Sequence, residues 1–423
     1  MKSRLLICLT AITLFGALAG RVRLAAQQQA QDLPRYTVID LGTFGGTYSE
    51  GDGISDSGWV LGDSTLPDGY GHAYLWRSGV MTDLGTLGGP DSWSGENTNI
   101  WGDGVGEAET TTPDPLNENW CGADDKCLPF LWRSDLKKMI ALPLLGGNNG
   151  IAWGVNDFRQ VAGEAETAAT DPTCPPNLQV MPVLWQNGEV QALPLFPGDP
   201  DGGATIINDF GQAVGDSGNC SGTILHAMLW ENGKAIYLGT VGGTFSNAIH
   251  INNLGQVVGY SGLPGNPFWH AFLWQKGVMT DLGTLSGDFT SEAFSINLEG
   301  QVVGWSGNSC GCQTRAFLWQ KGAMTDLNAL ISPESPLYLT FAVSINDEGQ
   351  IAGIGTTSTG ESHAFLATPS NGGPESETAT MATSTEHPNF SLSDNVQKML
   401  RRRARIAGFT PSAECKGGLV TPR

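Results

Sequence analysis

Basic residues are scarce in this chain, and long apolar runs are absent beyond its start. Of the 22 Lys and Arg, four precede residue 27 and seven follow residue 368, while 37 of the 42 Asp and Glu lie between. Residues 27–368 therefore carry 11 positive and 37 negative charges, a net of −26. A field of that sign repels phosphate backbones and excludes nucleic acid as a partner of this region. No later segment reaches about eighteen consecutive apolar residues, so we expect a soluble mature chain.

Recognisable enzyme motifs are also absent. The sequence contains no nucleophile elbow, HExxH, P-loop or EF-hand loop. Its 58 glycines are not embedded in the βαβ pattern of a dinucleotide-binding fold. General acid–base chemistry needs two carboxylates near one substrate, whereas a repeat spreads equivalent carboxylates apart. We therefore predict no catalytic residue, no metal and no cofactor, and favour a non-catalytic protein.

The first residues have the pattern of a secretory signal. Lys2 and Arg4 precede an apolar run over residues 5–19, and small residues follow the run. An uncleaved membrane anchor stays open as an alternative, because Arg21 and Arg23 follow closely, although the run is short for a spanning helix. We predict a signal peptide over residues 1–26 and a secreted protein, located in the periplasm, at the cell surface or outside the cell.

Cysteine usage agrees with an oxidising compartment. Seven cysteines follow the signal: Cys121, Cys127, Cys174, Cys220, Cys310, Cys312 and Cys415. The first pair is expected to close a small loop and the second to bridge neighbouring repeats. Cys310 and Cys312 form a tight ring or stay as thiols, and the odd count leaves Cys415 without an intramolecular partner. Zinc is the alternative, but no His accompanies these cysteines at ligand spacing.

An internal repeat dominates the chain. A Leu-Trp pair recurs at successive spacings of 56, 53, 45, 44 and 45 residues, and Ala367 takes the same place 48 residues further on. The tryptophans are Trp76, Trp132, Trp185, Trp230, Trp274 and Trp319. A period in the low forties with strand-like patterning is typical of propeller blades. Seven copies predict an all-β, seven-bladed propeller over residues 34–367.

Each copy divides into four short strands. In the fifth copy these are residues 246–251, 256–260, 270–274 and 278–282. Asn252-Asn253-Leu254-Gly255 between the first two strands is a tight turn, and Gln275-Lys276-Gly277 is another between the last two. Such short turns force antiparallel neighbours, so each blade is predicted to be a meander of strands A, B, C and D.

The two ends of the repeat region complement one another. Residues 36–41 match strand D without a preceding A, B or C, and residues 363–366 match strand C without a following D. We predict that the N-terminal strand completes the last blade and closes the ring, which removes exposed sheet edges. The alternative, an open array of seven units, would leave two unmatched half-blades.

The repeated words resemble those of the extracellular HAF repeat family. They are His270-Ala-Phe-Leu-Trp, His363-Ala-Phe-Leu, Asp-Leu-Gly-Thr-Leu-Gly-Gly at 83–89 and the Ile-Asn-x-x-Gly-Gln turns. The resemblance covers roughly residues 36–366 and is weaker in copies 2 to 4, where Leu128-Pro-Phe and Met181-Pro-Val replace the motif. It implies a secreted bacterial repeat protein of undefined role and supplies no catalytic residue.

Composition changes after residue 367. Residues 368–392 are rich in Ser, Thr, Pro, Gly and Glu and are predicted to be a disordered linker. The tail over residues 393–423 holds a candidate short basic helix at 394–406, with Lys398, Arg401, Arg402, Arg403 and Arg405. It would contact an anionic membrane surface or envelope polymer, fold back on the acidic propeller, or stay solvated.

Repeated polar residues are expected to be structural. His72, His226, His270 and His363 begin strand C in different copies, so they lie far apart around a ring. The acidic residue at the end of strand D, as in Asp40, Asp83, Asp281 and Asp326, is expected to accept hydrogen bonds from the following glycine-rich turn.

Departures from the repeat are the better functional lead. Extra length in copies 2 and 3 falls in the connections between strands B and C, at about 107–127 and 164–180. Candidate ligand-binding residues there are Glu107, Glu109, Trp120, Asp124 and Asp125. A Trp beside carboxylates suits a sugar or a basic peptide, so we predict a monomeric scaffold that binds protein or carbohydrate at the cell envelope. Loop drift, a purely structural surface role, and a hydrolase or lyase with loop acids stay open.

Overall fold

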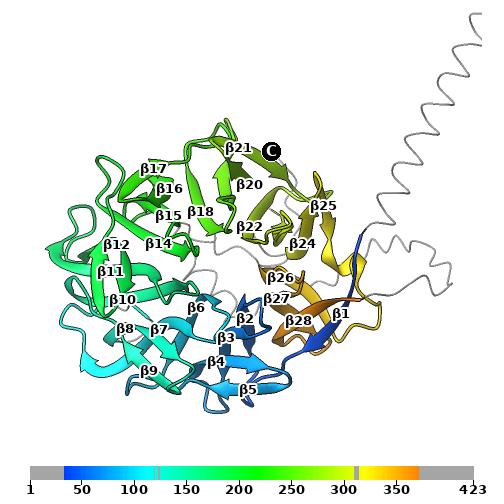
Figure 1. Ribbon diagram of the computed structural model, residues 1–423, viewed down its shortest axis with the longest axis horizontal. Coiled ribbons are helices and arrows are strands. Elements are labelled where there is room, and N and C mark those ends of the chain that lie inside the picture. The colour runs from blue at the N-terminus through cyan, green and yellow to red at the C-terminus, as the bar shows by residue number, and fades with distance from the viewer. Residues whose placement is uncertain (1–32, 119, 122–123, 309–313, 371–423) are drawn as a thin grey trace, which may run out of the picture.

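The protein is a ring of seven four-stranded antiparallel sheets, as predicted (Figure 1). The computed structural model describes residues 33–370 except 119, 122–123 and 309–313. The predicted signal peptide, linker and basic tail, and Cys310, Cys312 and Cys415, lie outside the described residues. Within them the single helical element is the 3-10 turn η1 (Leu327–Leu330). None of the described helices is long and apolar enough to cross a membrane.

The blades follow the chain in order, with strand A innermost. Blade 1 is β2(Ser49–Ile54), β3(Val60–Thr65), β4(Gly71–Arg77) and β5(Val80–Asp83); blade 2 is β6(Ser92–Thr98), β7(Gly104–Pro113), β8(Asp125–Arg133) and β9(Lys138–Ala141). Blade 3 is β10(Gly146–Val155), β11(Val161–Thr170), β12(Leu178–Gln186) and β13(Glu189–Ala192); blade 4 is β14(Asp201–Ile207), β15(Ala213–Gly218), β16(Leu225–Glu231) and β17(Lys234–Tyr237).

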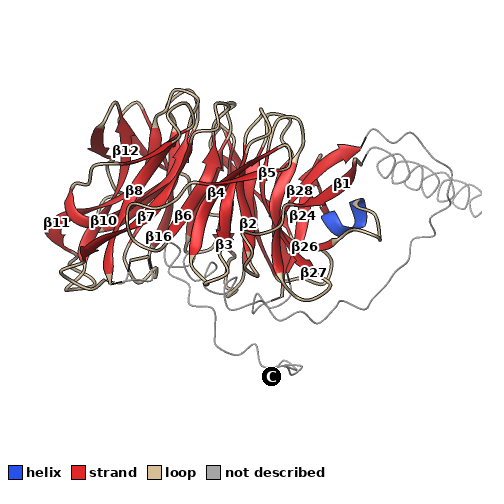
Figure 2. Cartoon of the chain, turned by 90° about the horizontal axis from the view of Figure 1, so that it is seen from below, coloured by secondary structure: helices blue, strands red, loops and turns tan. Residues whose placement is uncertain are grey.

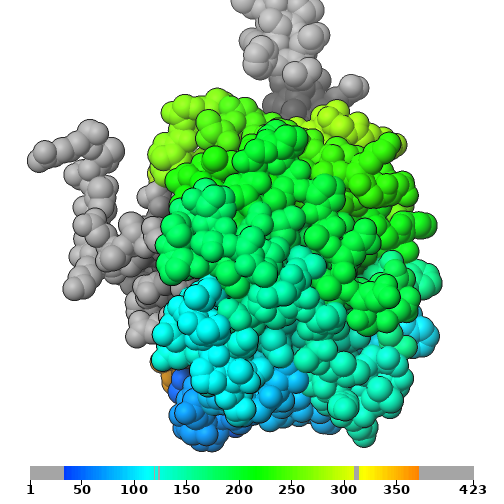
Figure 3. Space-filling model, turned by 90° about the vertical axis from the view of Figure 1, so that its left-hand side faces the viewer, coloured from blue at the N-terminus to red at the C-terminus, as the bar shows by residue number. Residues whose placement is uncertain are grey.

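The remaining blades complete the circle. Blade 5 is β18(Ser246–Ile251), β19(Val257–Gly262), β20(Trp269–Gln275) and β21(Val278–Gly283); blade 6 is β22(Thr290–Ile296), β23(Val302–Gly307), β24(Thr314–Gln320) and β25(Ala323–Asp326). Blade 7 is β26(Leu337–Ile345), β27(Ile351–Thr357), β28(Ser362–Ser370) and β1(Arg35–Asp40). Seen edge-on, the blades form a disc (Figure 2), and its rim at blades 2 to 4 is a continuous surface (Figure 3).

The N-terminal strand closes the ring, which confirms the prediction. β1 pairs antiparallel with β28 in the register Arg35 with Ser370 and Asp40 with Phe365. The guanidinium of Arg35 also donates to the carbonyl of Ala329 at 2.9 Å. Because the outer strand of blade 7 comes from the other end of the domain, blade 7 cannot be completed without it.

A glycine facing an aromatic ring repeats in the core. The third residue of strand B is glycine in all seven blades, and the residue opposite it on strand C is Tyr74, Phe130, Val183, Met228, Phe272, Phe317 or Phe365. These five aromatic residues are fully buried. A Cβ on Gly304 would overlap the backbone carbonyl of Glu292 on strand A and would also lie 2.9 Å from the ring of Phe317, so this position has no room for a side chain. This packing explains the Val-Val-Gly and Ala-Phe-Leu-Trp segments.

Buried asparagines link the blades at the turns between strands A and B. In blade 5 the Asn252 Oδ1 accepts the backbone N–H groups of Leu254 and Gln256, each at 3.0 Å. Its Nδ2 donates within the turn to Gln256 Oε1 at 2.8 Å and across to the carbonyl of Asn297 in blade 6 at 2.9 Å. The same cross-blade bond is made by Asn99, Asn156, Asn208, Asn297 and Asn346.

This asparagine belt almost closes on itself. Asn346 donates to the carbonyl of Ser55, so blade 7 is joined to blade 1. Blade 1 has Ser55 in the asparagine position, and there the Ser57 hydroxyl donates to the carbonyl of Ile100 in blade 2 at 2.7 Å. The Ile-Asn-x-x-Gly-Gln motif is therefore a device for joining blades.

The carboxylates at the end of strand D cap the next turn, as predicted. Asp83 Oδ1 accepts the N–H of Gly85 at 2.7 Å, and Asp40 and Asp281 make the same bond to Gly42 and Gly283. In blade 6 the Asp326 carboxylate accepts the N–H of Asn328 and caps η1.

Candidate functional site

The B–C hairpins of blades 2 and 3 depart most from the repeat. β7 and β8 have 10 and 9 residues, and β11 and β12 also have 10 and 9, against 6 or 7 for strands B and C in blades 1, 4, 5 and 6. The sequence interpretation of these segments as long loops was wrong in one respect. Glu107, Glu109 and Glu164 lie inside ladders, because the two strands continue to pair beyond the length of the other blades.

Trp120 is the central aromatic residue of the first hairpin. Its ring is partly buried and its indole N–H donates to Glu107 Oε2 at 2.8 Å. Glu107 itself is only 1% exposed. Cys121 and Cys127 form a disulfide beside the ring, with Cα atoms 6.2 Å apart. The indole is thus held by a charge-assisted hydrogen bond, and the disulfide constrains the neighbouring backbone, while the residue stays partly accessible.

The other candidate carboxylates spread along the same hairpin. Asp124 is exposed and Asp125 is partly exposed, near the tip, while Glu109 is buried in the ladder. Burial first, and then the carboxylates of Asp91 and Asp125, raise the pKa of Glu109. The structure therefore brings Trp120 and Glu107 into contact and leaves Asp124 free to meet solvent, whereas Glu109 faces inward.

A second cluster of carboxyl side chains, gathered around Asn149, joins the two hairpins. The Asn149 amide lies within 3.5 Å of oxygens of Asp114, Glu118 and Glu166. Glu166 accepts the N–H groups of Asn148 and Asn149 at 2.9 and 2.8 Å. Burial and the neighbouring Glu118 raise the pKa of Glu166 to about 8 against the lowering effect of these N–H groups. Burial and the neighbouring Glu118 thus favour the protonated form of Glu166.

A third cluster of carboxyl side chains, Asp171 and Asp201, lies between blades 3 and 4. Burial and the carboxylate of Asp171 raise the pKa of Asp201 to about 6, although the N–H of Val180 lowers it. Beside it, Cys174 and Cys220 form a disulfide that ties the two blades, with Cα atoms 6.3 Å apart. Asp171 and these two sulfurs lie close enough to hold a metal, but oxidised sulfurs are not thiolate ligands.

Acidic residues also occupy one repeated position across half of the ring. The fourth residue of strand B is acidic in blades 1 to 4 and apolar or aromatic in blades 5 to 7: Asp63, Glu107, Glu164 and Asp216, then Tyr260, Trp305 and Ile354. Two of these side chains contact strand A of the next blade: Asp63 accepts the N–H of Ser94 at 2.6 Å, and the Trp305 ring lies 6.0 Å from that of Phe341.

Strand A adds two further carboxylates in blade 1. Asp52 is an extra, bulged residue of β2, between Gly51 and Gly53. Oxygens of Glu50, Asp52 and Asp63 all lie within 4.8 Å of one another, and the three side chains are at most 4% exposed. An oxygen-only group of this kind matches the ligand preference of a hard cation. We call Glu50, Asp52, Asp63, Glu107, Glu164 and Asp216 the acidic arc.

Burial and repulsion between neighbouring carboxylates raise the pKa of two residues of the arc. Burial first, then Asp216 and Glu107, raise the pKa of Glu164 well above its usual range. Burial, then Asp199 and Asp201, do the same for Asp216. Carboxyl groups in this state act as hydrogen-bond donors while they keep their proton and as cation ligands once they lose it.

The repeated histidines do not converge on a site. His72, His270 and His363 each place Nδ1 about 2.9 Å from the carboxylate at the end of strand D in their own blade. His226 instead contacts Asp199 at 2.8 Å. Each pair links strand C to a neighbouring segment of the chain, in agreement with a structural role.

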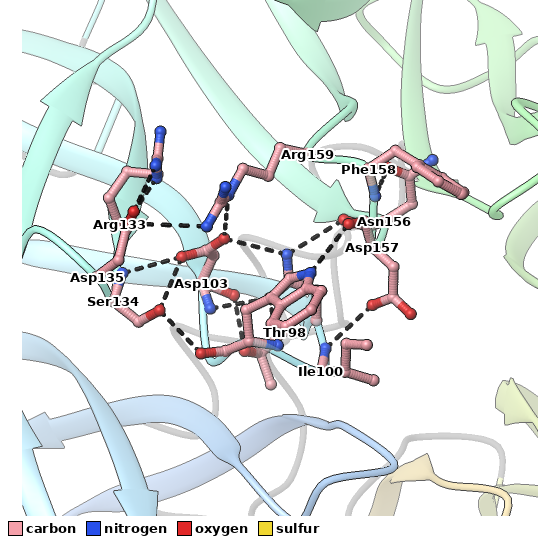
Figure 4. A network of polar contacts seen from close by, with 12 residues as sticks. Thr98, Ile100, Asp103, Arg133, Ser134, Asp135, Asn156, Asp157, Phe158 and Arg159 are labelled. Atoms are coloured by element: carbon pink, nitrogen blue, oxygen red, sulfur yellow. Dashed lines mark hydrogen bonds and ion pairs between the residues drawn. The ribbon is translucent and has the colours of Figure 1, made fainter.

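A polar network joins the A–B turns of blades 2 and 3 and the C–D turn of blade 2 (Figure 4). The fully buried Asp103 accepts Arg159 Nε at 2.7 Å, and it also accepts the N–H of Ser134 at 2.9 Å. Arg133 and Asp135 extend the group toward solvent. Since every charge here has a partner, the network joins the two blades and offers no open position for a ligand.

Comparisons with known proteins assign no family to this chain. No protein-family model and no curated protein matches the chain. Solved structures that resemble it include the propeller domain of the Trilobed protease from Pyrococcus furiosus, at 11% identity and TM-score 0.44, covering 65% of this chain and 79% of that chain. A puromycin-hydrolyzing peptidase of Mycobacterium tuberculosis matches at 12% identity and TM-score 0.49, over 85% and 57%.

A third match is TolB from Acinetobacter baumannii, at 12% identity and TM-score 0.37, covering 56% of this chain and 52% of that chain. This chain thus spans little more than half the length of the second and third structures.

Several of these polar residues were not among the sequence candidates. Asp114, Glu118, Glu166, Asp201 and Asp216 were missed, although Gly-Glu-Ala-Glu-Thr occurs twice, at 106–110 and 163–167. An acidic residue at the fourth position of a buried strand, repeated in consecutive blades, was the available signal.

Proposed function

We propose that this chain is a secreted, non-catalytic scaffold that binds a protein or carbohydrate at the cell envelope through the B–C hairpins of blades 2 and 3. The observation that carries the proposal is the tip of the first hairpin. There the Trp120 ring is held by Glu107 and the Cys121–Cys127 disulfide, beside the exposed Asp124. A rigid, partly exposed aromatic ring next to carboxylates suits stacking on a sugar or clamping a basic side chain.

Export rests on separate support. The signal-like residues 1–26, the resemblance to extracellular HAF repeats and two disulfides all fit an oxidising compartment outside the cytoplasm. The matched solved structures lend nothing to the choice of ligand.

A glycan array and a pull-down from envelope fractions test this function with the mature protein. We expect saturable binding that Trp120→Ala weakens by about ten-fold or more, since aromatic anchors often contribute over 1 kcal/mol. Trp101→Ala is the matched control. Trp101 is 56% exposed near the A–B turn of blade 2, away from the hairpin tip, where its indole donates to the carbonyl of Asp157. Equal losses in both variants, or no binding to any fraction, would refute the proposal.

A hydrolase or lyase is the second candidate function, because a carboxyl protonated at neutral pH beside a second acid is what a general acid requires. Glu166 and Glu118 form such a pair. Screening glycosides and peptides with wild type and Glu166→Gln tests this. Turnover that the variant loses, with an alkaline limb near pH 8, would favour the enzyme; turnover unchanged in the variant would remove this pair from consideration.

A further inference from the structure

The two flat faces of the disc carry different connections and different side chains (Figure 2). In a meander of strands A to D, the A–B and C–D turns share one face, and the B–C turns and the crossovers to the next blade share the other. We call the first the A–B face. Of the described large apolar residues, the seven most exposed, at 56–75%, all lie on the A–B face. They are Val80, Trp101, Leu136, Phe158, Phe210, Leu254 and Val278.

Three of these residues occupy one position of the A–B turn in consecutive blades. Phe158, Phe210 and Leu254 each lie two residues after the buried asparagine, whose Oδ1 accepts their backbone N–H at 3.0–3.1 Å. They are 68%, 75% and 62% exposed. Because the asparagine belt fixes each turn to the next, the three side chains stand at equivalent heights on the face. We call them the apolar crest.

Trp101 takes the same position in blade 2, where its backbone N–H donates to Asn99 Oδ1 at 3.1 Å. Its indole N–H is engaged by the carbonyl of Asp157 at 3.1 Å. The ring of Trp101 is therefore tied to the neighbouring turn, and it is not counted in the crest.

A polar layer, and not a hydrophobic core, lies beside the crest. The N–H of Asp157 donates to Asp209 Oδ1 at 3.0 Å, and Asn253 Nδ2 donates to Asp209 Oδ2 at 2.8 Å. Within the described part of the chain, the crest residues belong to none of the hydrophobic clusters. Apolar side chains that recur at one exposed position without packing on the fold indicate a surface that meets a partner.

Charge on the A–B face differs from that of the rest of the ring. The A–B and C–D turns, with the strand residues that flank them, hold eight of the 11 Lys and Arg of residues 27–368 and ten of the 37 Asp and Glu. The net charge there is −2, against −26 for the whole region. This face therefore repels an anionic surface less than any other part of the ring. The basic residues are Arg77, Arg133, Lys137, Lys138, Arg159, Lys234, Lys276 and Lys321.

Both ends of the described ring also lie on the A–B face. Strand C of blade 7 ends at Ser370, where it pairs with Arg35 at the start of β1. The two segments for which the sequence offers a membrane contact are the apolar run at 5–19 and the basic residues within 394–406. Both are therefore attached to the ring on the face that carries the crest.

We propose that the A–B face is a membrane-docking surface, on which the apolar crest enters the headgroup region of a lipid bilayer. Separate apolar side chains raised on polar turns fit the bilayer interface, which accepts each of them independently, whereas a protein interface needs a contiguous apolar core. The surrounding Lys and Arg side chains fit the phosphate groups of lipid headgroups. A ring docked in this way presents the Trp120 hairpin on the side away from the membrane.

Flotation with lipid vesicles tests the proposal on the mature protein. The probe is a vesicle of phosphatidylcholine with about one fifth phosphatidylglycerol, which contains neither protein nor glycan. We expect Phe158→Ser, Phe210→Ser and Leu254→Ser together to lower the bound fraction about ten-fold or more, since three apolar side chains lose their bilayer contact. Wild type that does not float with these vesicles overturns the proposal.

A matched control removes three exposed apolar side chains from the opposite face and should leave vesicle binding unchanged. These changes are Tyr70→Ser, Ile224→Ser and Phe289→Ser, at residues 46%, 43% and 52% exposed. Thermal melting checks that both triple variants fold. Equal losses of binding in the two triple variants overturn the proposal, because the A–B face would then have no special part.

The basic tail is separated from the face by a third variant. Arg401→Ser, Arg402→Ser and Arg403→Ser together should lower binding less than the crest substitutions do. Binding that depends on these arginines alone overturns the proposal. A concentration-dependent dimer in gel filtration that the crest substitutions abolish assigns the face to a second copy of the chain, and overturns it as well.

This inference does not rest on the proposed function, because the two surfaces lie on opposite faces of the ring. Trp120→Ala should leave vesicle binding unchanged, and the crest substitutions should leave binding on a glycan array unchanged. Failure of the vesicle experiment therefore leaves the ligand of the Trp120 hairpin untouched, and the reverse holds too.

Discussion

Single side chains with several partners set the spacing of the blades. Asn252 is the best example, because its amide nitrogen makes one bond inside its turn and one to the next blade, while its oxygen accepts two N–H groups. Its neighbours in the belt repeat this pattern with exposures of 3–6%. Glutamine is the one other side chain with an amide group, and it is one methylene longer than asparagine and does not fit this turn.

Asn252→Ala should lower the free energy of unfolding by about 2–3 kcal/mol, since it leaves two N–H groups and one carbonyl without their partners. Asn266→Ala, in the exposed B–C turn of blade 5, removes a single local bond to Phe268 and should cost under about 1 kcal/mol. Denaturant unfolding measures both. Equal effects would mean that the belt adds nothing beyond an ordinary turn.

Glu166→Gln should flatten the pH dependence of stability. The pKa of Glu166 is raised to about 8 from 4.5, so the folded state binds a proton more tightly than the unfolded state. Wild type therefore loses stability as pH rises from about 4.5 to 8, on the order of 2 kcal/mol after allowance for its shared proton. The variant keeps an uncharged group at all pH values. Thermal unfolding at pH 5 and pH 8 decides this, and a wild-type profile flat over that range would contradict it.

At the scale of elements, disulfides hold the B–C connections. Cys174–Cys220 spans 46 residues and two blades, whereas Cys121–Cys127 spans 6 within one hairpin. Chain entropy assigns them about 4 and about 2.4 kcal/mol. We expect Cys174→Ser with Cys220→Ser to lower the melting temperature more than Cys121→Ser with Cys127→Ser, as followed by calorimetry. A larger loss of melting temperature on removing Cys121–Cys127 would show that this disulfide does more than hold Trp120.

The elements themselves were predictable because repeats reduce the problem to one blade. Strands 246–251, 256–260, 270–274 and 278–282 were predicted, and the structure has β18 to β21 within two residues of those limits. The hairpins of blades 2 and 3 were harder, because Glu107 and Glu109 are polar and polarity is read as loop. Only tertiary burial against the next blade shows that these acids belong to strands.

The candidate site was less predictable than the fold. Trp120 and Glu107 were both singled out, but nothing in their spacing revealed that one donates to the other. Acids brought together by the ring, such as Glu164 with Asp216, lie in different blades, and their effect on each other's pKa follows from burial that no local pattern reports.

The whole molecule depends on one junction between its ends. β1 and β28 form the seam, where Asp40 meets His363 at 2.9 Å, so the pair joins residues 323 positions apart. The hydrogen bond to Asp40, against the effect of burial, raises the pKa of His363. Burial would raise the pKa of Asp40, but the hydrogen bonds from His363 and Gly42 lower it overall.

The two shifts define where the seam is most stable. A raised histidine pKa contributes stability below about 6.5 that is lost as pH rises through the folded-state value. A lowered aspartate pKa contributes stability above about 4 that is lost on acidification. The seam should therefore be strongest between about pH 4 and 6.5.

His363→Gln and Asp40→Asn should each cost about 1 kcal/mol at pH 5.5, and the double variant little more than either, because both remove one ion pair. Thermal unfolding of wild type, the two single variants and the double variant gives the coupling free energy between His363 and Asp40. Additive losses would mean that the seam is held by its backbone ladder and Tyr36 alone, with the ion pair contributing nothing to closure.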